Sequence, residues 1–289
     1  MVGINVQCRL GNQLFQYAFI KALAERFNTS FYLNEKIEPL IAADYFDLEG
    51  YSPTRNMINK FLLKIESGNL IKKLRATDVD TYSEAAYNML TNHTIYNGYF
   101  QSELFFKDIA AKMPAYIRVK KKHIAKFQNE YNNIFTNNRT IAVHIRRGDY
   151  LNLDNWWAEN FGSNNLSLPT SYYLKCLEQV PDHKNCKIIF VSDDIDFVRT
   201  EFAHISNCEF SQSDMITDFQ IIMNADVCIL SNSSFAWWAA FLNPKNNKLV
   251  YCPQYWLGFK VKKEYPENII PAGWNQVTVE PAIEAKIAE

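Results

Sequence analysis

Two adjacent arginines are the residues whose type and position in this sequence best suit chemistry. Arg146 and Arg147 come directly after the apolar run Thr140–Ile145 and are followed by Gly148 and Asp149. Guanidinium groups match phosphate oxygens in bidentate fashion and keep their charge at any working pH. Gly148 permits a tight turn, and Asp149 can hold one arginine by an ion pair. The segment predicts either a phosphate site or an ordinary surface arginine pair at a strand end.

Acidic and hydroxyl side chains follow two further apolar runs. The four residues are Asp193 and Asp194 after residues 187–191, and Ser233 and Ser234 after residues 227–230. The carboxylates can accept hydrogen bonds from ribose hydroxyls or guanine, or they can cap a helix that begins at Ile195. Hydroxyls and the first amides of a helix are groups that bind phosphate. Both pairs are therefore candidates for a nucleotide site.

The elements that must position these residues alternate between strand and helix. We expect strands at residues 2–8, 31–33, 94–98, 140–145, 187–191, 208–210, 227–230 and 249–251. We expect helices at residues 14–27, 103–112, 195–202, 215–224 and 235–241, with residues 113–131 mostly helical. The alternation predicts doubly wound parallel sheets, in which the carboxyl ends of the strands border the ligand crevice. A polar, Asn-rich stretch at residues 132–139 marks the boundary between an N-terminal α/β domain (1–139) and a C-terminal Rossmann-like domain (140–289).

Composition excludes several classes of protein. The 289 residues include 30 basic and 31 acidic side chains, which argues against a nucleic-acid partner because binding of duplexes needs a surplus of cations. Six scattered cysteines without a C-x-x-C pair indicate reduced thiols and no zinc site. No apolar run is long enough to span a bilayer, and no signal peptide precedes residue 2, so we expect a cytoplasmic protein. Peripheral membrane association is left open.

Four segments in order resemble a known family. His144–Tyr150, with the pattern His-x-Arg-Arg-x-Asp, is similar to the first motif of the GDP-fucose-dependent fucosyltransferases in its alpha-1,2 version. Arg9–Tyr17 resembles the N-terminal glycine loop, Gly98–Glu103 the segment before the linker, and Ser231–Ala240 the C-terminal motif. The last segment departs from the family pattern, which has Thr at position 234 and Gly at position 239. The chain is identified as resembling the alpha-1,2-fucosyltransferases of glycosyltransferase family 11.

The resemblance implies a fold and a reaction. The fold would be GT-B, with two facing Rossmann-like doubly wound domains, of which the second binds GDP-fucose and the first faces a glycan acceptor. The reaction would transfer L-fucose with inversion to the 2-hydroxyl of a galactoside, without cofactor or metal. Arg146 would contact the β-phosphate, Arg147 would support the phosphates or the loop, His144 would shape the strand end, and Asp149 would orient the arginines. His144 as a general base is the alternative role.

The resemblance also assigns residues away from the arginines. Asp218 would pair with the N1 and N2 donors of guanine, although it also suits a solvated helix start. Gly11, Asn12 and Gln13 would face the cleft, with Asn12 or Gln13 reaching the fucose or the acceptor. Trp156 and Trp157 lie in a polar stretch, residues 151–168, and predict either an acceptor-side lid or a contact with the other domain.

Rival functions remain at this stage. Transfer to a different hydroxyl, or from a different GDP-sugar, would use the same guanine and phosphate contacts. A sugar-nucleotide-binding protein without turnover is a further alternative, which the intact arginine and carboxylate motifs disfavour. Asp78-Val79-Asp80 fits the Asp-x-Asp string of metal-dependent transferases, but it lies in an irregular stretch, and we interpret it as a coincidence.

Overall fold

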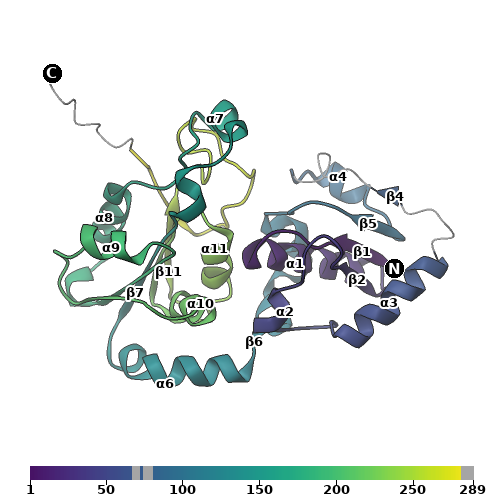
Figure 1. Ribbon diagram of the computed structural model, residues 1–289, viewed down its shortest axis with the longest axis horizontal. Coiled ribbons are helices and arrows are strands. Elements are labelled where there is room, and N and C mark those ends of the chain that lie inside the picture. Colours follow the sequence, from purple (N-terminus) through teal and green to yellow (C-terminus); the bar gives the residue numbers. More distant parts are fainter. Residues whose placement is uncertain (67–71, 74–80, 281–289) are drawn as a thin grey trace. The chain divides into compact units, whose positions relative to one another are not determined.

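The computed structural model describes residues 1–66, 72–73 and 81–280 (Figure 1). Contacts within the chain divide it into two compact units. The first comprises Met1–Ala125 and Pro266–Pro271, and the second comprises Lys126–Tyr265 and Ala272–Glu289. The segment Pro266–Pro271 is bound into the first unit, where Asn268 O accepts a hydrogen bond of 2.6 Å from Ser102 Oγ and Ile269 is buried.

The first unit contains a parallel four-stranded sheet with the order β2-β1-β5-β4. Its strands are β1 (Val2–Asn5), β2 (Phe31–Asn34), β4 (Lys72–Lys73) and β5 (Thr94–Tyr96). Its helices are α1 (Leu10–Arg26), α2 (Ala42–Tyr45), α3 (Pro53–Glu66), α4 (Glu84–Asn88), the 3₁₀ segment η2 (Glu103–Lys112) and α5 (Met113–Tyr116). Helix α1 is apolar around most of its circumference, as expected of a helix enclosed by other elements. Phe19 of α1 stacks on Phe100 with ring centres 3.7 Å apart.

The second unit contains a parallel six-stranded sheet with the order β12-β11-β10-β7-β8-β9. Its strands are β7 (Thr140–Ile145), β8 (Lys187–Ser192), β9 (Cys208–Phe210), β10 (Val227–Ile229), β11 (Leu249–Pro253) and β12 (Asn275–Val277). Its helices are α7 (Asn155–Phe161), α8 (Thr170–Gln179), α9 (Ile195–Glu201), α10 (Met215–Asn224) and α11 (Ser234–Phe241), with 3₁₀ turns η3 (Gly148–Leu151) and η4 (His183–Asn185). Figure 1 shows α8 and α9 on one side of the sheet and α10 and α11 on the other.

The strand order of the second unit is that of a dinucleotide-binding fold. Counted from β7 along the chain, the six strands lie in the order 3-2-1-4-5-6, which is the Rossmann order. All six residues of β7 are buried, and β7 pairs with β8 in register along its full length. In such a sheet, ligands bind beyond the carboxyl ends of the two strands where the winding reverses. Here those strands are β7 and β10.

Three local expectations differ from the structure, two because of contacts with distant elements and one because of a local helix cap. Within the predicted helix 113–131, β6 (Ile117–Val119) pairs antiparallel with β3 (Phe46–Leu48). The predicted loop 151–168 contains α7, because Asp154 caps its start by accepting a 3.1 Å hydrogen bond from the Trp156 amide.

The predicted boundary stretch is the third difference. Helix α6 (Lys121–Asn137) runs through most of residues 132–139, and the contact division falls earlier, between Ala125 and Lys126. The reason is that α6 packs on the second unit. Tyr131 OH lies 3.1 Å from Ser213 Oγ, and Lys126 Nζ forms a 2.9 Å ion pair with Asp214.

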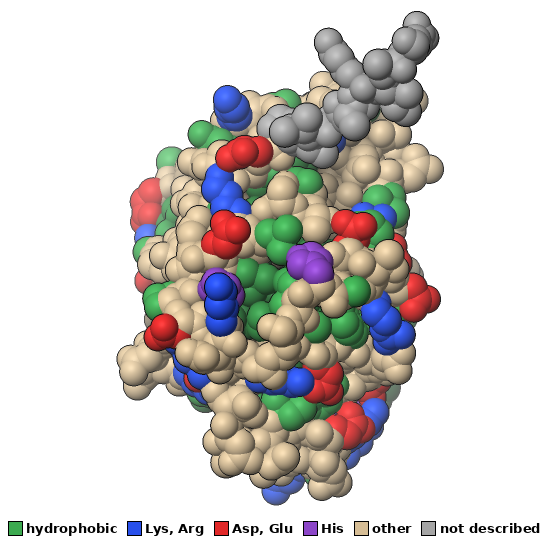
Figure 2. Space-filling view, turned by 90° about the vertical axis from the view of Figure 1, so that its left-hand side faces the viewer, with side chains coloured by type: hydrophobic (Ala, Val, Ile, Leu, Met, Phe, Trp, Pro, Cys, Tyr) green, Lys and Arg blue, Asp and Glu red, His purple; other side chains and the backbone are tan. Residues whose placement is uncertain are grey.

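Neither sign of charge dominates the surface, as the balanced composition leads one to expect. Figure 2 shows one face of the molecule, on which basic and acidic side chains alternate instead of gathering by sign. In the part of the chain that the structure describes, no helix combines the length and the apolar character needed to cross a membrane.

Candidate active site

The arginine segment leaves the carboxyl end of β7, which is where the winding of the sheet reverses. Arg146 follows the last residue of β7, and Ser231 lies two residues after the end of the neighbouring β10. The Ser231 amide donates a 3.1 Å hydrogen bond to His144 O, so the backbone ladder holds the two strand ends together. The two segments that we predicted to bind phosphate, at 146–149 and 233–234, therefore begin side by side.

Two carboxylates hold Arg146. Its NH2 group forms an ion pair with Asp149, and its NH1 group lies 2.9 Å from Asp193 Oδ2. The Arg146 guanidinium also lies 5.5 Å from the centre of the Tyr150 ring. A guanidinium carries five N–H donors, so these contacts fix its position and leave donors for a further anion. The side chain is 18% exposed, so part of it remains accessible to a ligand at the carboxyl end of β7.

Arg147 is turned toward the start of α9. Its Nε lies 3.0 Å from Asp194 Oδ2, and its guanidinium carbon lies 3.3 Å from the centre of the Phe197 ring. Its backbone amide donates a 2.9 Å hydrogen bond to Asp193 Oδ1. Stacking on an aromatic face and pairing with a carboxylate together define one position for this side chain. Arg147 therefore braces the loop, while Arg146 is the arginine better placed to meet a ligand.

The carboxylates after β8 serve the arginines and the helix start. Asp194 is the N-cap of α9 and accepts a hydrogen bond of 3.4 Å from the Phe197 amide. Asp193 bridges the Arg146 side chain and the Arg147 backbone. Both acids thus have partners within the protein, which accounts for them without a contact to ribose or guanine.

Gly148 allows the carboxylate of Asp193 to approach the loop. A Cβ atom built on Gly148 would lie 2.3 Å from Asp193 Oδ2, closer than real Cβ contacts. Glycine is required here for space between two segments, whereas the sequence suggested only a tight turn. Any larger residue must displace the acid that holds both arginines.

His144 is a buried neutral imidazole. It is 5% exposed, and its Nδ1 lies 2.7 Å from Ser231 Oγ. Burial first, and then the positive charge of Arg146, lower the pKa of His144 to about 3. A base this weak is poorly suited to take a proton from a sugar hydroxyl near neutral pH. The geometry favours the structural role, in which His144 ties the end of β7 to the segment after β10.

The hydroxyls after β10 lie at the start of α11. Ser233 is the N-cap, is buried, and forms no side-chain cap hydrogen bond, while Ser234 is partly exposed in the first helical turn. Helix starts leave backbone N–H groups without intrahelical partners, and these suit an anion. Trp237 and Trp238 are fully buried further along α11, so they belong to the core of the unit.

Asp218 lies in the first turn of α10, although the cap of that helix is Asp214. Its Oδ1 accepts a 2.5 Å hydrogen bond from Ser211 Oγ. Burial raises the pKa of Asp218 to about 7, while the hydrogen bond from Ser211 opposes the shift. The solvated helix start that we considered as an alternative does not fit this half-buried acid. Ionising this carboxyl group costs free energy, and Ser211 is the one side chain that donates a hydrogen bond to it among the described contacts. Asp218 is therefore a candidate to accept hydrogen bonds from a ligand.

The predicted residues of the first unit lie at the start of α1. Gly11 is buried in the first turn of the helix, which begins at Leu10, where the resemblance implied a glycine loop and the expected helix began only at residue 14. The Gln13 amide is occupied by the backbone, because its Nε2 donates to Cys8 O and Pro39 O at 2.9 Å each and its Oε1 accepts from the Ala42 amide. Asn12 is partly exposed and accepts a 2.6 Å hydrogen bond from Gln101. Of these residues, Asn12 is the one with a side chain placed to reach a ligand.

Trp156 and Trp157 begin α7 and form an aromatic cluster within the second unit. Their ring centres lie 5.0 Å apart, and Trp157 lies 5.4 Å from Phe161. Tyr265 completes the cluster, 4.7 Å from Phe161. Trp156 remains 46% exposed. This geometry leaves both predicted roles of the pair available, a lid over an acceptor or a contact with the other unit.

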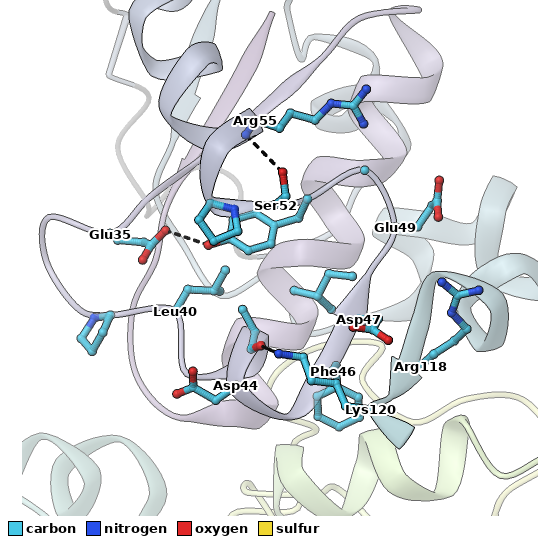
Figure 3. A pocket seen from close by; sticks show the side chains of 16 residues that line it. Glu35, Leu40, Asp44, Phe46, Asp47, Glu49, Ser52, Arg55, Arg118 and Lys120 are labelled. Atoms are coloured by element: carbon cyan, nitrogen blue, oxygen red, sulfur yellow. Dashed lines mark hydrogen bonds between the residues drawn. The ribbon is translucent and has the colours of Figure 1, made fainter. Parts of the chain in front are cut away.

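An open pocket of about 890 Å³ lies in the first unit, between α2, β3 and the start of α3 (Figure 3). Acidic and basic side chains are interleaved around it; they are Glu35, Asp44, Asp47, Glu49, Arg55, Arg118 and Lys120. Mixed charge provides no focused positive potential for a diphosphate. The Arg146 edge of the second unit suits a nucleotide better.

Metal ligands are not grouped in the described part of the chain, where no three His, Cys, Asp or Glu side chains lie together as a metal site. Asp78-Val79-Asp80 lies outside the described residues. Two partners of the site were missed from sequence. Ser231 and Phe197 contact His144 and Arg147 from distant elements, and neither has a local pattern that could have revealed it.

Comparisons of sequence and of structure relate the chain to known proteins. The sequence matches the family model described as glycosyl transferase family 11 over residues 1–277. The O-antigen biosynthesis glycosyltransferase WbnK of Escherichia coli is 34% identical over 132 residues, and the match covers 43% of this chain and 41% of that protein. The chain thus aligns with less than half the length of WbnK. An alpha-1,2-colitosyltransferase of Escherichia coli is 25% identical over 287 residues, covering 86% of this chain and 89% of that protein.

A solved structure shares the fold. The alpha-1,6-fucosyltransferase NodZ, which is from Bradyrhizobium and was soaked with GDP-fucose, aligns with a TM-score of 0.54 at 12% identity. The alignment covers 84% of this chain and 92% of NodZ. At this identity the likeness establishes the fold alone, which is of the GT-B type with Rossmann-like α/β units.

Proposed function

The chain belongs to glycosyl transferase family 11, and from that premise we propose that it transfers L-fucose from GDP-β-L-fucose, with inversion, to the 2-hydroxyl of a galactoside. One observation carries the proposal. Arg146 is held by Asp149 and Asp193 at the point of the Rossmann sheet where nucleotides bind. A guanidinium fixed before the reaction needs no reorganisation when charge develops beside it.

The proposed role of Arg146 follows from the charges of the reaction. When the sugar–phosphate bond breaks, GDP gains negative charge and the fucose ring becomes cation-like. Arg146 would stabilise the β-phosphate, assisted by the first amides of α11. Removing one preorganised donor of this kind costs about 10²–10³ in rate. Asp218 would accept hydrogen bonds from the N1 and N2 groups of guanine. The pKa of His144 argues against that residue as the base, and a loose transition state demands little from any base.

Similar proteins support the proposed donor and the proposed linkage. NodZ was soaked with GDP-fucose, which supports this donor, and the colitosyltransferase is named for a 1,2 linkage, which supports this bond. The same name favours a second candidate, a transferase for a different deoxysugar. Colitose is fucose without its 3-hydroxyl, so both donors would present the same guanine and phosphates. Turnover measured with each donor distinguishes the two candidates.

The proposal includes transfer without a metal ion, and GDP release tests it. The protein is incubated with GDP-fucose and lactose in the presence of EDTA. We expect release that requires lactose and persists in EDTA, and we expect Arg146→Ala to lose it while still folding. Strict dependence on magnesium or manganese, or an Arg146→Ala variant with more than about a tenth of the wild-type rate, would contradict the charge argument. Tight GDP binding without release would indicate a binding protein instead.

A further inference from the structure

Helix α3 places polar side chains toward the core of the first unit. It packs beside β2, the edge strand of the sheet (Figure 1). Asn56 accepts a hydrogen bond from the Leu33 amide and donates one to Leu33 O, each of 2.9 Å. Asn59 donates a 2.7 Å hydrogen bond to Phe31 O. An edge strand leaves N–H and C=O groups unpaired, and these two asparagines satisfy them.

The opposite side of α3 is apolar and exposed. Met57 is 67% exposed, Ile58 51%, Phe61 63% and Leu62 39%. Their spacing of one, four and five residues puts them on one stripe of the helix. A surface helix of a globular protein normally turns such a stripe toward the core. Because the asparagines occupy the inner side, α3 has the reverse orientation, and its stripe has no partner among the described residues.

Two cations flank the stripe. At about 100° per residue, Arg55 falls beside Leu62 on one flank, and Lys60 falls beside Met57 on the other. Neither forms an ion pair with a described residue, and no acidic residue occurs between positions 53 and 62. An apolar stripe between basic side chains is the pattern of a helix that lies in a membrane interface.

We propose that α3 docks on an anionic lipid surface. Met57, Ile58, Phe61 and Leu62 would enter the boundary between headgroups and acyl chains, and Arg55 and Lys60 would reach the lipid phosphates. A second copy of this chain is the less suitable occupant. Two-fold pairing of α3 would bring Arg55 and Lys60 against the same cations, without an acid in that stretch to pair them.

Vesicle binding tests the proposal with the full chain. We compare sedimentation with vesicles of phosphatidylcholine alone and of phosphatidylcholine mixed with phosphatidylglycerol. Wild type should prefer the anionic vesicles and bind less at high salt. Burying the exposed apolar area of Ile58 or Phe61 in the lipid should strengthen vesicle binding about tenfold for each residue. The double variant Ile58→Gln, Phe61→Gln should therefore bind about a hundredfold more weakly. Arg55→Gln with Lys60→Gln should weaken binding to the anionic vesicles about thirtyfold and leave binding to the neutral vesicles unchanged.

Met89 provides a matched control, because it is 79% exposed at the end of α4, outside the stripe. Met89→Gln should bind vesicles like wild type. Transfer to soluble lactose should be unchanged in the Ile58→Gln, Phe61→Gln variant, which separates this proposal from the proposed function. Absence of wild-type binding, or equal binding by the stripe variant, would overturn the proposal. A dimer that Phe61→Gln dissociates would overturn it in favour of a second copy.

Discussion

Replacing Gly148 by alanine should disable the site while leaving the fold nearly unchanged. The added Cβ would lie 2.3 Å from Asp193 Oδ2, and ordinary contact begins at 3.4 Å, so the oxygen must move by about 1 Å. That oxygen is the partner of Arg146 NH1 at 2.9 Å. A shift of this size either breaks the ion pair or moves Arg146 with it.

The magnitudes separate activity from stability. A misplacement of about 1 Å in a catalytic constellation can cost about 10² in rate. The ion pair is partly solvated and contributes at most about 1 kcal/mol to stability. Replacement of glycine by alanine lowers the conformational entropy of the unfolded chain, which raises the unfolding free energy by about 0.4–1 kcal/mol. We therefore expect transfer to fall about a hundredfold while Tm changes by a few degrees at most.

A double-mutant cycle makes the test specific. GDP release is measured for Gly148→Ala, Asp193→Ala and the double variant, with thermal unfolding followed in parallel. Without the carboxylate of Asp193, the new Cβ meets no oxygen, so Gly148→Ala should add no loss in the Asp193→Ala background. Near-normal transfer by Gly148→Ala, or a full additional loss in the double variant, would refute the steric argument.

Three further predictions concern other residues. Burial raises the pKa of Asp218 to about 7 in the folded protein, so the folded state binds this proton more tightly than the unfolded chain does. The unfolding free energy of the nucleotide-free protein should therefore fall as pH rises from about 4 to about 7 and then level off. In denaturant titrations, Asp218→Asn should flatten this slope. Asn56→Leu leaves both backbone groups of Leu33 unpaired and should lower the unfolding free energy by about 2–4 kcal/mol, and a value within error of wild type contradicts the capping role. The ammonium group of a lysine at position 146 cannot span two phosphate oxygens, so Arg146→Lys should lower the transfer rate at least about tenfold. Near-normal kinetics of this variant would contradict a bidentate contact.

Strong local patterns made much of the second unit predictable. The continuous apolar run at Thr140–Ile145 and the arginines after it indicated a buried strand that ends at a ligand site, and β7 has those bounds. Strand β9 and helix α10 also begin and end where the periodicity predicted. Strand β7 was predictable because burial on both faces of a parallel sheet leaves a continuous apolar run.

Partners from distant elements could not be predicted. Phe197 lies beneath Arg147, and Ser211 donates to Asp218, through contacts that sequence spacing does not encode. The sequence around Gly148 indicates only a turn, because the requirement for space at this position depends on Asp193, which follows a different strand, β8. The outward orientation of the α3 stripe is not encoded locally for a related reason. A helical pattern identifies two sides, but only the edge of β2 determines which side turns inward.

The late segment Pro266–Pro271 has a consequence for synthesis of the protein. Domains generally fold as units while the ribosome is still working, beginning at the N-terminus. Here the first unit includes Ile269 and the acceptor of the Ser102 hydroxyl, both of which are synthesised after residues 126–265 of the second unit. The N-terminal half of the chain must therefore wait, incompletely closed, until almost all of the second unit has been made.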